Sequence, residues 1–144
     1  MRHLIVVIGL FILGFQANGQ LYMAQNGEVS FFSKTPLEDI DALNKQVGSI
    51  INADNNEVAV QMRVSSFVFP NKLMQEHFNE NYLESDKYPR TSFKGVVPNF
   101  DLDKISPEGT FLKINGTIKI HGVSKPITVS GFFKKTKNQL NYFF

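Results

Sequence analysis

The chain has 144 residues, among them 14 phenylalanines and no cysteine, and its formal net charge is only +2. Without cysteine it can form no disulfide and offers no thiol for lipid attachment, and this length suits a single domain. The small charge argues against nucleic-acid binding, which usually requires a strongly basic surface.

The N-terminal segment has the three parts of an export signal. Arg2 and His3 precede an apolar run from Leu4 to Phe15, which is followed by the small-residue site at residues 17–19. The run is too short to cross a bilayer, because a spanning helix needs roughly 20 apolar residues. We therefore expect a cleaved signal peptide over residues 1–19. The mature domain, residues 20–144, would then be periplasmic or secreted, without stable insertion in a membrane.

Most of the remaining chain has the pattern of β-strands. Six segments alternate apolar and polar residues or are bounded by turn-forming residues. They are residues 28–33, 47–52, 57–65, 91–97, 112–120 and 127–130. Successive side chains of a strand point to opposite faces, so the two clearest segments each place four apolar side chains on one face. These are Val58, Val60, Met62 and Val64, and Leu112, Ile114, Ile118 and Ile120.

One helix interrupts the predicted strands. Between Phe69 and Leu83 the apolar residues recur at three- and four-residue spacing, and Pro70 suits the first turn of a helix. A second segment, residues 37–43, reads equally well as a turn of helix or as a polar connection. Many strands with one helix predict an antiparallel sheet closed into a barrel or folded into a sandwich. A barrel of this size is filled by its own side chains or holds one small ligand.

Two segments resemble the YceI-like family. Residues 73–93 match its stretch of helix, aromatic residue, proline and phenylalanine-containing strand, and residues 116–127 match its strand ending in His-Gly-Val-Ser-Lys with a return strand. The resemblance covers about residues 27–131. It implies a lipocalin-like antiparallel β-barrel, usually periplasmic, whose apolar interior holds a polyisoprenoid chain. The expected partner is therefore a polyisoprenoid or similar lipid.

The resemblance bears on two ambiguous places. Asn115-Gly116 could form a two-residue hairpin turn, but the apolar residues stay in phase across it, as in the family's single strand over residues 111–120. Gly116 would then mark a bend or a close backbone approach, and the turn would fall at residues 122–126. Residues 132–144 do not resemble the family and lack sustained alternation. We expect a barrel incomplete at its C-terminal end, with open sheet edges through which chains could associate.

The candidate ligand contacts are the two apolar strand faces, with Phe93, Phe78 and Tyr82 at a mouth. In full they are Val58, Val60, Met62, Val64, Phe78, Tyr82, Phe93, Leu112, Ile114, Ile118 and Ile120. No cysteine and no metal-ligand spacing is present, so we predict no metal, no cofactor and no catalytic residue. His121 is expected to fix the turn at residues 122–126 through a hydrogen bond. Two alternatives stay open: an enzyme that uses His121 on a small apolar substrate, and a truncated remnant without function.

Overall fold

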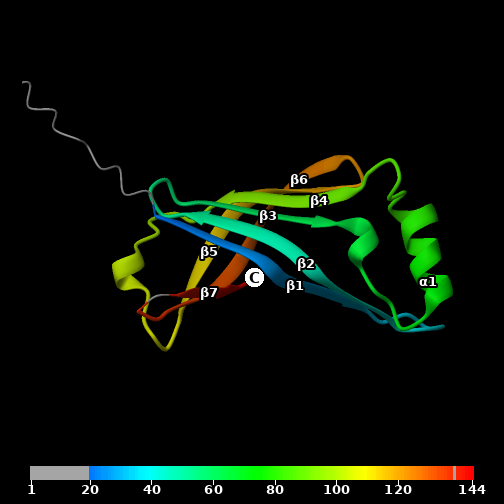
Figure 1. The fold of residues 1–144 in the computed structure, drawn as a ribbon, viewed down its shortest axis with the longest axis horizontal. Helices are drawn as coiled ribbons and strands as arrows, with labels where there is room; N and C mark the ends of the chain where they lie inside the picture. The colour runs from blue at the N-terminus through cyan, green and yellow to red at the C-terminus, as the bar shows by residue number, and fades with distance from the viewer. Residues whose placement is uncertain (1–19, 138) are drawn as a thin grey trace, which may run out of the picture.

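The computed structural model describes residues 20–137 and 139–144, and the predicted signal peptide lies outside this part of the chain. A seven-stranded antiparallel sheet, in which each strand pairs with the next, curls into a nearly closed barrel (Figure 1). Its strands are β1 (Leu21–Ser33), β2 (Ile40–Asn52), β3 (Glu57–Arg63), β4 (Arg90–Val96), β5 (Thr110–Ile120), β6 (Val123–Lys135) and β7 (Leu140–Phe143). The predicted antiparallel barrel with one short helix is confirmed.

The barrel interior is filled by alternate residues of the strands and by four residues of the connection between β4 and β5. The buried residues of this cluster, called the main core below, are Val47, Ile51, Val58, Val60, Phe93, Val97, Phe100, Leu102, Ile105, Ile114 and Phe133. The predicted strand faces therefore point inward. Across the interior, the Tyr142 hydroxyl of β7 hydrogen-bonds with the Ser49 hydroxyl of β2, which links the last strand to one near the start of the sheet. The strands β1 and β7 are the two edges of the sheet.

The predicted helix is present as α1 (Lys72–His77), followed by one π-helical segment, η2 (Phe78–Tyr82). The side chain of Asn71 caps α1, because its Oδ1 accepts hydrogen bonds from the backbone N–H groups of Leu73 (3.0 Å) and Met74 (3.2 Å). Pro70 therefore lies before the cap rather than in the first turn. Figure 1 shows the helix covering one end of the barrel.

The expectation of one strand across Asn115-Gly116 is confirmed, because β5 pairs with β6 without interruption from Thr110 to Ile120. A Cβ added at Gly116 would lie 2.4 Å from the backbone oxygen of Lys94 and 2.6 Å from the ring of Phe93. Only glycine allows this close approach between β4 and β5.

The turn predicted at residues 122–126 is wrong. The chain reverses at His121 and Gly122, and β6 already begins at Val123. Both turn residues have positive φ, 52° for His121 and 71° for Gly122. That combination is the two-residue hairpin turn whose twist matches the flanking strands, and a strand register that begins with Ile120 opposite Val123 fits it.

Three other segments differ from expectation or resolve an open alternative. Residues 37–43 form neither a turn of helix nor a purely polar connection, because β2 begins at Ile40 and buries Ala42. Val64 and Ser65, expected at the end of a strand, belong to the 3-10 helix η1 (Val64–Ser66). Residues 132–144 continue β6 to Lys135 and then form β7. No helix among the described residues is long and apolar enough to cross a membrane.

Candidate functional site

A cluster of four aromatic side chains occupies the helix-covered end of the barrel. Phe31 comes from β1, Phe67 and Phe69 from the connection after η1, and Phe78 from the start of η2. The rings of Phe69 and Phe78 lie 4.8 Å apart, and the ring of Phe31 stacks on Phe78 at 5.6 Å. Such tilted and offset pairs add stability beyond their buried area. We call this set, with Ala42, the mouth cluster.

An apolar cavity of about 400 Å³ opens between the mouth cluster and α1. This mouth pocket is lined by Phe31, Glu38, Ile40, Phe69, Asn71, Leu73, Met74, His77, Phe78 and Tyr82. Tyr82 and Leu73 stand at its rim, 72% and 58% exposed. The size falls within the roughly 300–1,000 Å³ of small-molecule sites, as does the combination of an apolar wall with a few polar groups.

Hydrogen bonds hold the walls of the mouth pocket in place. The backbone N–H of Phe69 donates to Oε1 of Gln75 at 3.0 Å, which ties the connection after η1 to α1. The side chain of Asn71 donates to Oε1 of Glu38 at 3.1 Å, so the start of α1 is joined to the segment between β1 and β2. The pocket is therefore built by three segments that are distant in the sequence.

The mouth forms because the chain leaves β3 early. The buried Asn44 of β2 donates to the backbone oxygen of Arg63 at 2.9 Å and accepts from the N–H of Gln46 at 2.9 Å, so its buried amide is bonded at both ends. Beyond this point η1 turns the chain away, and its backbone meets β2 again at an isolated bridge between Leu43 and Val68. The helix α1 and the rings of the mouth cluster occupy the space that a longer β3 would fill.

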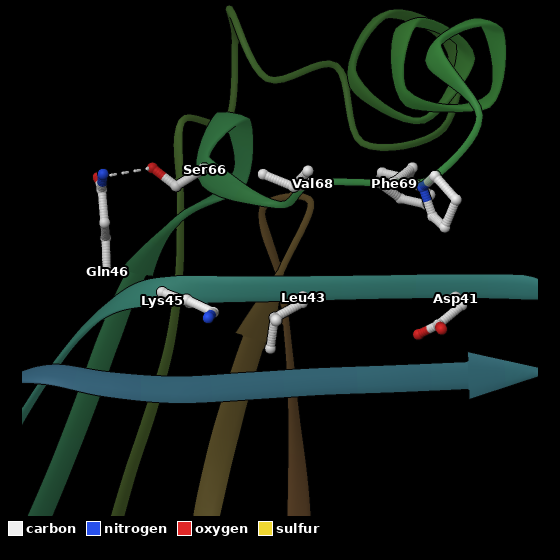
Figure 2. Close-up of a pocket in the computed structure, with 8 residues that line it drawn as sticks. Asp41, Leu43, Lys45, Gln46, Ser66, Val68 and Phe69 are labelled. Carbon is white, nitrogen blue, oxygen red and sulfur yellow. Dashed lines mark hydrogen bonds between the residues drawn. The ribbon is translucent and has the colours of Figure 1, made fainter.

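The same connection borders a second hollow on the outer side of β2, which Figure 2 shows. This groove of about 510 Å³ is lined by Asp41, Leu43, Lys45, Gln46, Ser66, Val68, Phe69 and Pro70. The Ser66 hydroxyl donates to Oε1 of Gln46 at 3.1 Å across it. The lining of this groove combines charged side chains of both signs with apolar side chains, whereas the mouth pocket is lined mainly by aromatic and aliphatic side chains.

The predicted ligand contacts fall into three groups in the structure. Val58, Val60, Phe93 and Ile114 are buried in the main core, and Met62, Leu112 and Ile118 pack against it. Val64 is buried as well, while Ile120, next to the turn, is 37% exposed. Phe78 and Tyr82 line the mouth pocket, and Phe93, which was placed at the same mouth in the sequence analysis, lies in the main core.

Met62 connects the two apolar regions, because it packs against both the main core and the mouth cluster. Its unbranched thioether can adapt to neighbours of different shape. Met62 therefore lies between the mouth cluster and the barrel interior.

Several lining residues were missed by the sequence reasoning, namely Phe31, Ile40, Phe69, Leu73 and Met74. Phe31 and Ile40 lie near the β1–β2 connection, and nothing in their local pattern places them beside a helix more than thirty residues further along the chain. The available signal was the density of aromatic residues just before the helix, which indicates an apolar surface to be covered there.

His121 does not line the mouth pocket. Its Nε2 lies 2.6 Å from Oε2 of Glu84, and its ring meets that of Tyr88 edge to face at 4.7 Å. The hydrogen bond from the Lys87 ammonium, with a second from His121, holds the pKa of the Glu84 carboxyl below its ordinary value. His121 thus fastens the β5–β6 turn to the loop after η2. The hydrogen bond of His121 was expected to fix the turn itself. In the structure it joins that turn to Glu84 in another loop.

Among the described residues, no group of three or more histidine, aspartate or glutamate side chains could hold a metal ion.

The sequence model of the YceI-like domain family matches residues 15–142 of the chain. This chain belongs to the YceI-like family. The match continues past residue 131, where the resemblance was expected to end, and takes in β7.

Two solved structures are similar to this YceI-like chain. A polyisoprenoid binding domain from Saccharophagus degradans, implicated in plant cell wall breakdown, matches with a TM-score of 0.66 and 13% identity, over 80% of this chain and 67% of that one. A YCEI protein from Campylobacter jejuni matches with a TM-score of 0.46 and 17% identity, over 92% and 69%. The chain thus spans about two thirds of the length of these structures. Comparison with curated proteins found no match.

Proposed function

We propose that this protein binds a polyisoprenoid or similar long apolar lipid outside the cytoplasm and performs no chemistry on it. The observation that carries the proposal is the mouth pocket, an apolar cavity of about 400 Å³ at the helix-covered end of a YceI-like barrel. The similarity to the Saccharophagus degradans domain, which is a polyisoprenoid binding domain, supports the choice of ligand. The export signal predicted in residues 1–19 supports the location.

Hydrophobic contact would supply the affinity. Each methylene moved from water into such a wall contributes roughly 0.8 kcal/mol, so a few isoprene units suffice for useful binding. Glu38, Asn71 and His77 are polar side chains in the same lining, and they are placed to meet a terminal hydroxyl or other polar end. A long apolar wall with few polar groups selects for shape and chain length rather than for a particular head group.

The inner part of the site is proposed to follow the inward strand faces. Met62 adjoins the mouth cluster, and Val60 and Phe93 lie next to each other in the β3–β4 register beyond it. In this proposal the first isoprene units occupy the mouth pocket. Movement of Met62 would then admit further units along the faces of β3 and β5.

A pair of variants tests the proposal. Leu73→Asp places a charge at the exposed rim of the mouth pocket. It should leave the fold intact, because an acidic residue in the first turn of α1 is favourable to the helix. Val123→Asp, 54% exposed at the start of β6, is the matched control. Binding of geranylgeraniol, measured by fluorescence competition in detergent, should weaken about tenfold in Leu73→Asp, equivalent to ~1.4 kcal/mol. Equal affinity in both variants would contradict the proposed site.

A further inference from the structure

A second surface of the barrel has a different chemistry. Residues of β1 to β6, most of them outward-facing, line an open groove of about 1030 Å³. Four basic residues stand in it, Arg63 on β3, Arg90 and Lys94 on β4, and Lys119 on β5, and all four are exposed. We call this surface the basic groove. It shares no lining residue with the mouth pocket.

The positive charge of the basic groove is not balanced locally. No aspartate or glutamate belongs to its lining, and none of the four basic side chains forms an ion pair within the described part of the chain. The whole chain carries a formal charge of only +2. Positive charge is therefore concentrated on this face rather than spread evenly over the molecule.

The strand register brings like charges together. Arg63 of β3 lies directly opposite Arg90 of β4, an arrangement that destabilises a sheet. Lys119 lies opposite Ser92, two residues from Arg90 on the same face of β4. A bound anion would relieve this repulsion.

Exposed apolar residues adjoin the charges. Met23 of β1, 64% exposed, pairs with Ile50 of β2, 39% exposed, and both line the groove. The same cross-strand row continues through Ala59 to Lys94. Basic side chains beside an exposed apolar pair match the two layers of a lipid surface, in which phosphates lie above the start of the acyl chains.

We propose that the basic groove docks this protein on an anionic lipid surface. The lipid phosphates would contact the four basic side chains, while Met23 and Ile50 reach the acyl region. Free phosphate, or a peptide of acidic residues alone, would satisfy the charges but would leave the exposed apolar pair without a partner. The proposal goes beyond lipid binding in the mouth pocket and does not depend on it.

The test measures co-sedimentation of the full chain with vesicles of phosphatidylglycerol and phosphatidylcholine, compared with vesicles of phosphatidylcholine alone. The double variant Lys94→Gln/Lys119→Gln should bind the anionic vesicles roughly 25-fold more weakly, about fivefold for each lysine. The control Lys72→Gln/Lys104→Gln removes the same charge from exposed sites in α1 and in the 3-10 helix η3 (Leu102–Lys104), and it should bind as the unmodified chain does. Because every variant keeps residues 1–19, any contribution of that segment is the same in all.

Three results would overturn the proposal. Equal loss of binding to anionic vesicles in the two double variants would mean that only the total charge of the protein matters. Release by inorganic phosphate at constant ionic strength would indicate a discrete phosphate site. Failure to bind anionic vesicles, together with binding of a polyglutamate peptide, would assign the surface to an acidic protein partner. Geranylgeraniol binding in detergent should be the same in all variants. A failure of the basic-groove proposal is therefore distinguishable from a failure of the proposal that the mouth pocket binds lipid.

Discussion

The main core and the mouth cluster of this barrel contain the same kinds of side chain but differ in how completely these side chains are buried. In the main core, Ile51, Ile114 and Phe133 have no exposed surface, because paired strands and the β4–β5 connection with Phe100 cover them. In the mouth cluster, Phe31 and Phe78 stay half-buried and border a cavity. The difference lies in how completely the rings are covered: strands and the β4–β5 connection close over the main core, whereas a short helix and a connection leave a cavity beside the mouth cluster. A pocket arises here where the sheet pairing ends.

The largest expected effect separates the two clusters by stability. Phe133→Ala removes a ring that is fully buried among paired strands and should lower the free energy of unfolding by about 3–5 kcal/mol. Phe78→Ala removes a half-buried ring, so it should cost less stability but weaken geranylgeraniol binding. Urea unfolding and fluorescence competition measure the two quantities. Equal destabilisation by both changes would show that the mouth cluster is ordinary core.

A second prediction concerns how tightly the main core is packed. Gly116→Ala forces a methyl group against the backbone of Lys94 and the ring of Phe93 and should destabilise the protein by about 1–3 kcal/mol. Gly48→Ala is the matched control, because its nearest neighbour, the backbone oxygen of Gln61, would lie at an ordinary 3.8 Å. The control should be neutral or slightly stabilising in urea unfolding. Similar losses in both variants would argue against close packing at Gly116.

The smallest expected effect is a pH dependence at the loop beyond the mouth. The pKa of Glu84 is lowered by Lys87 and then by His121, so the unfolded chain binds its proton more readily than the folded one. The stabilisation is complete above the ordinary value of 4.5 and is lost as pH falls from there through the lowered pKa. The free energy of unfolding, measured by urea at a series of acid pH values, should therefore change less with pH in Glu84→Gln than in the control Glu80→Gln. An unchanged slope would mean that the Glu84 contacts do not contribute.

The same contacts bear on the catalytic alternative for His121. Because His121 is held by Glu84 and Tyr88 away from the mouth pocket, His121→Gln should leave geranylgeraniol affinity unchanged. A turnover activity that is lost in this variant while lipid binding persists would favour the enzyme instead.

The inward faces of β3 and β5 were predictable, whereas β7 and the exit of the chain from β3 at the mouth were not, for a physical reason. A period of two identifies strand faces from neighbouring residues alone, so Val58, Val60, Ile114 and their neighbours were placed inward correctly. The mouth pocket depends on where β3 stops pairing, which the buried Asn44 and η1 decide through contacts across the sheet. Alternation continues to Val64 in the sequence and gives no warning of that exit. Long-range contacts of this kind leave no local periodic signal.

The central claim, that ligand enters at the mouth cluster and reaches the main core only past Met62, can be tested with the methionine methyl groups. Met74 lines the mouth pocket, Met62 joins the two clusters, and Met23 lies in the basic groove. In methyl NMR of methionine-labelled protein, titration with geranylgeraniol should shift the Met74 signal most, move Met62 less and leave Met23 in place. A shift confined to Met23, or no shift at Met74, would contradict the account.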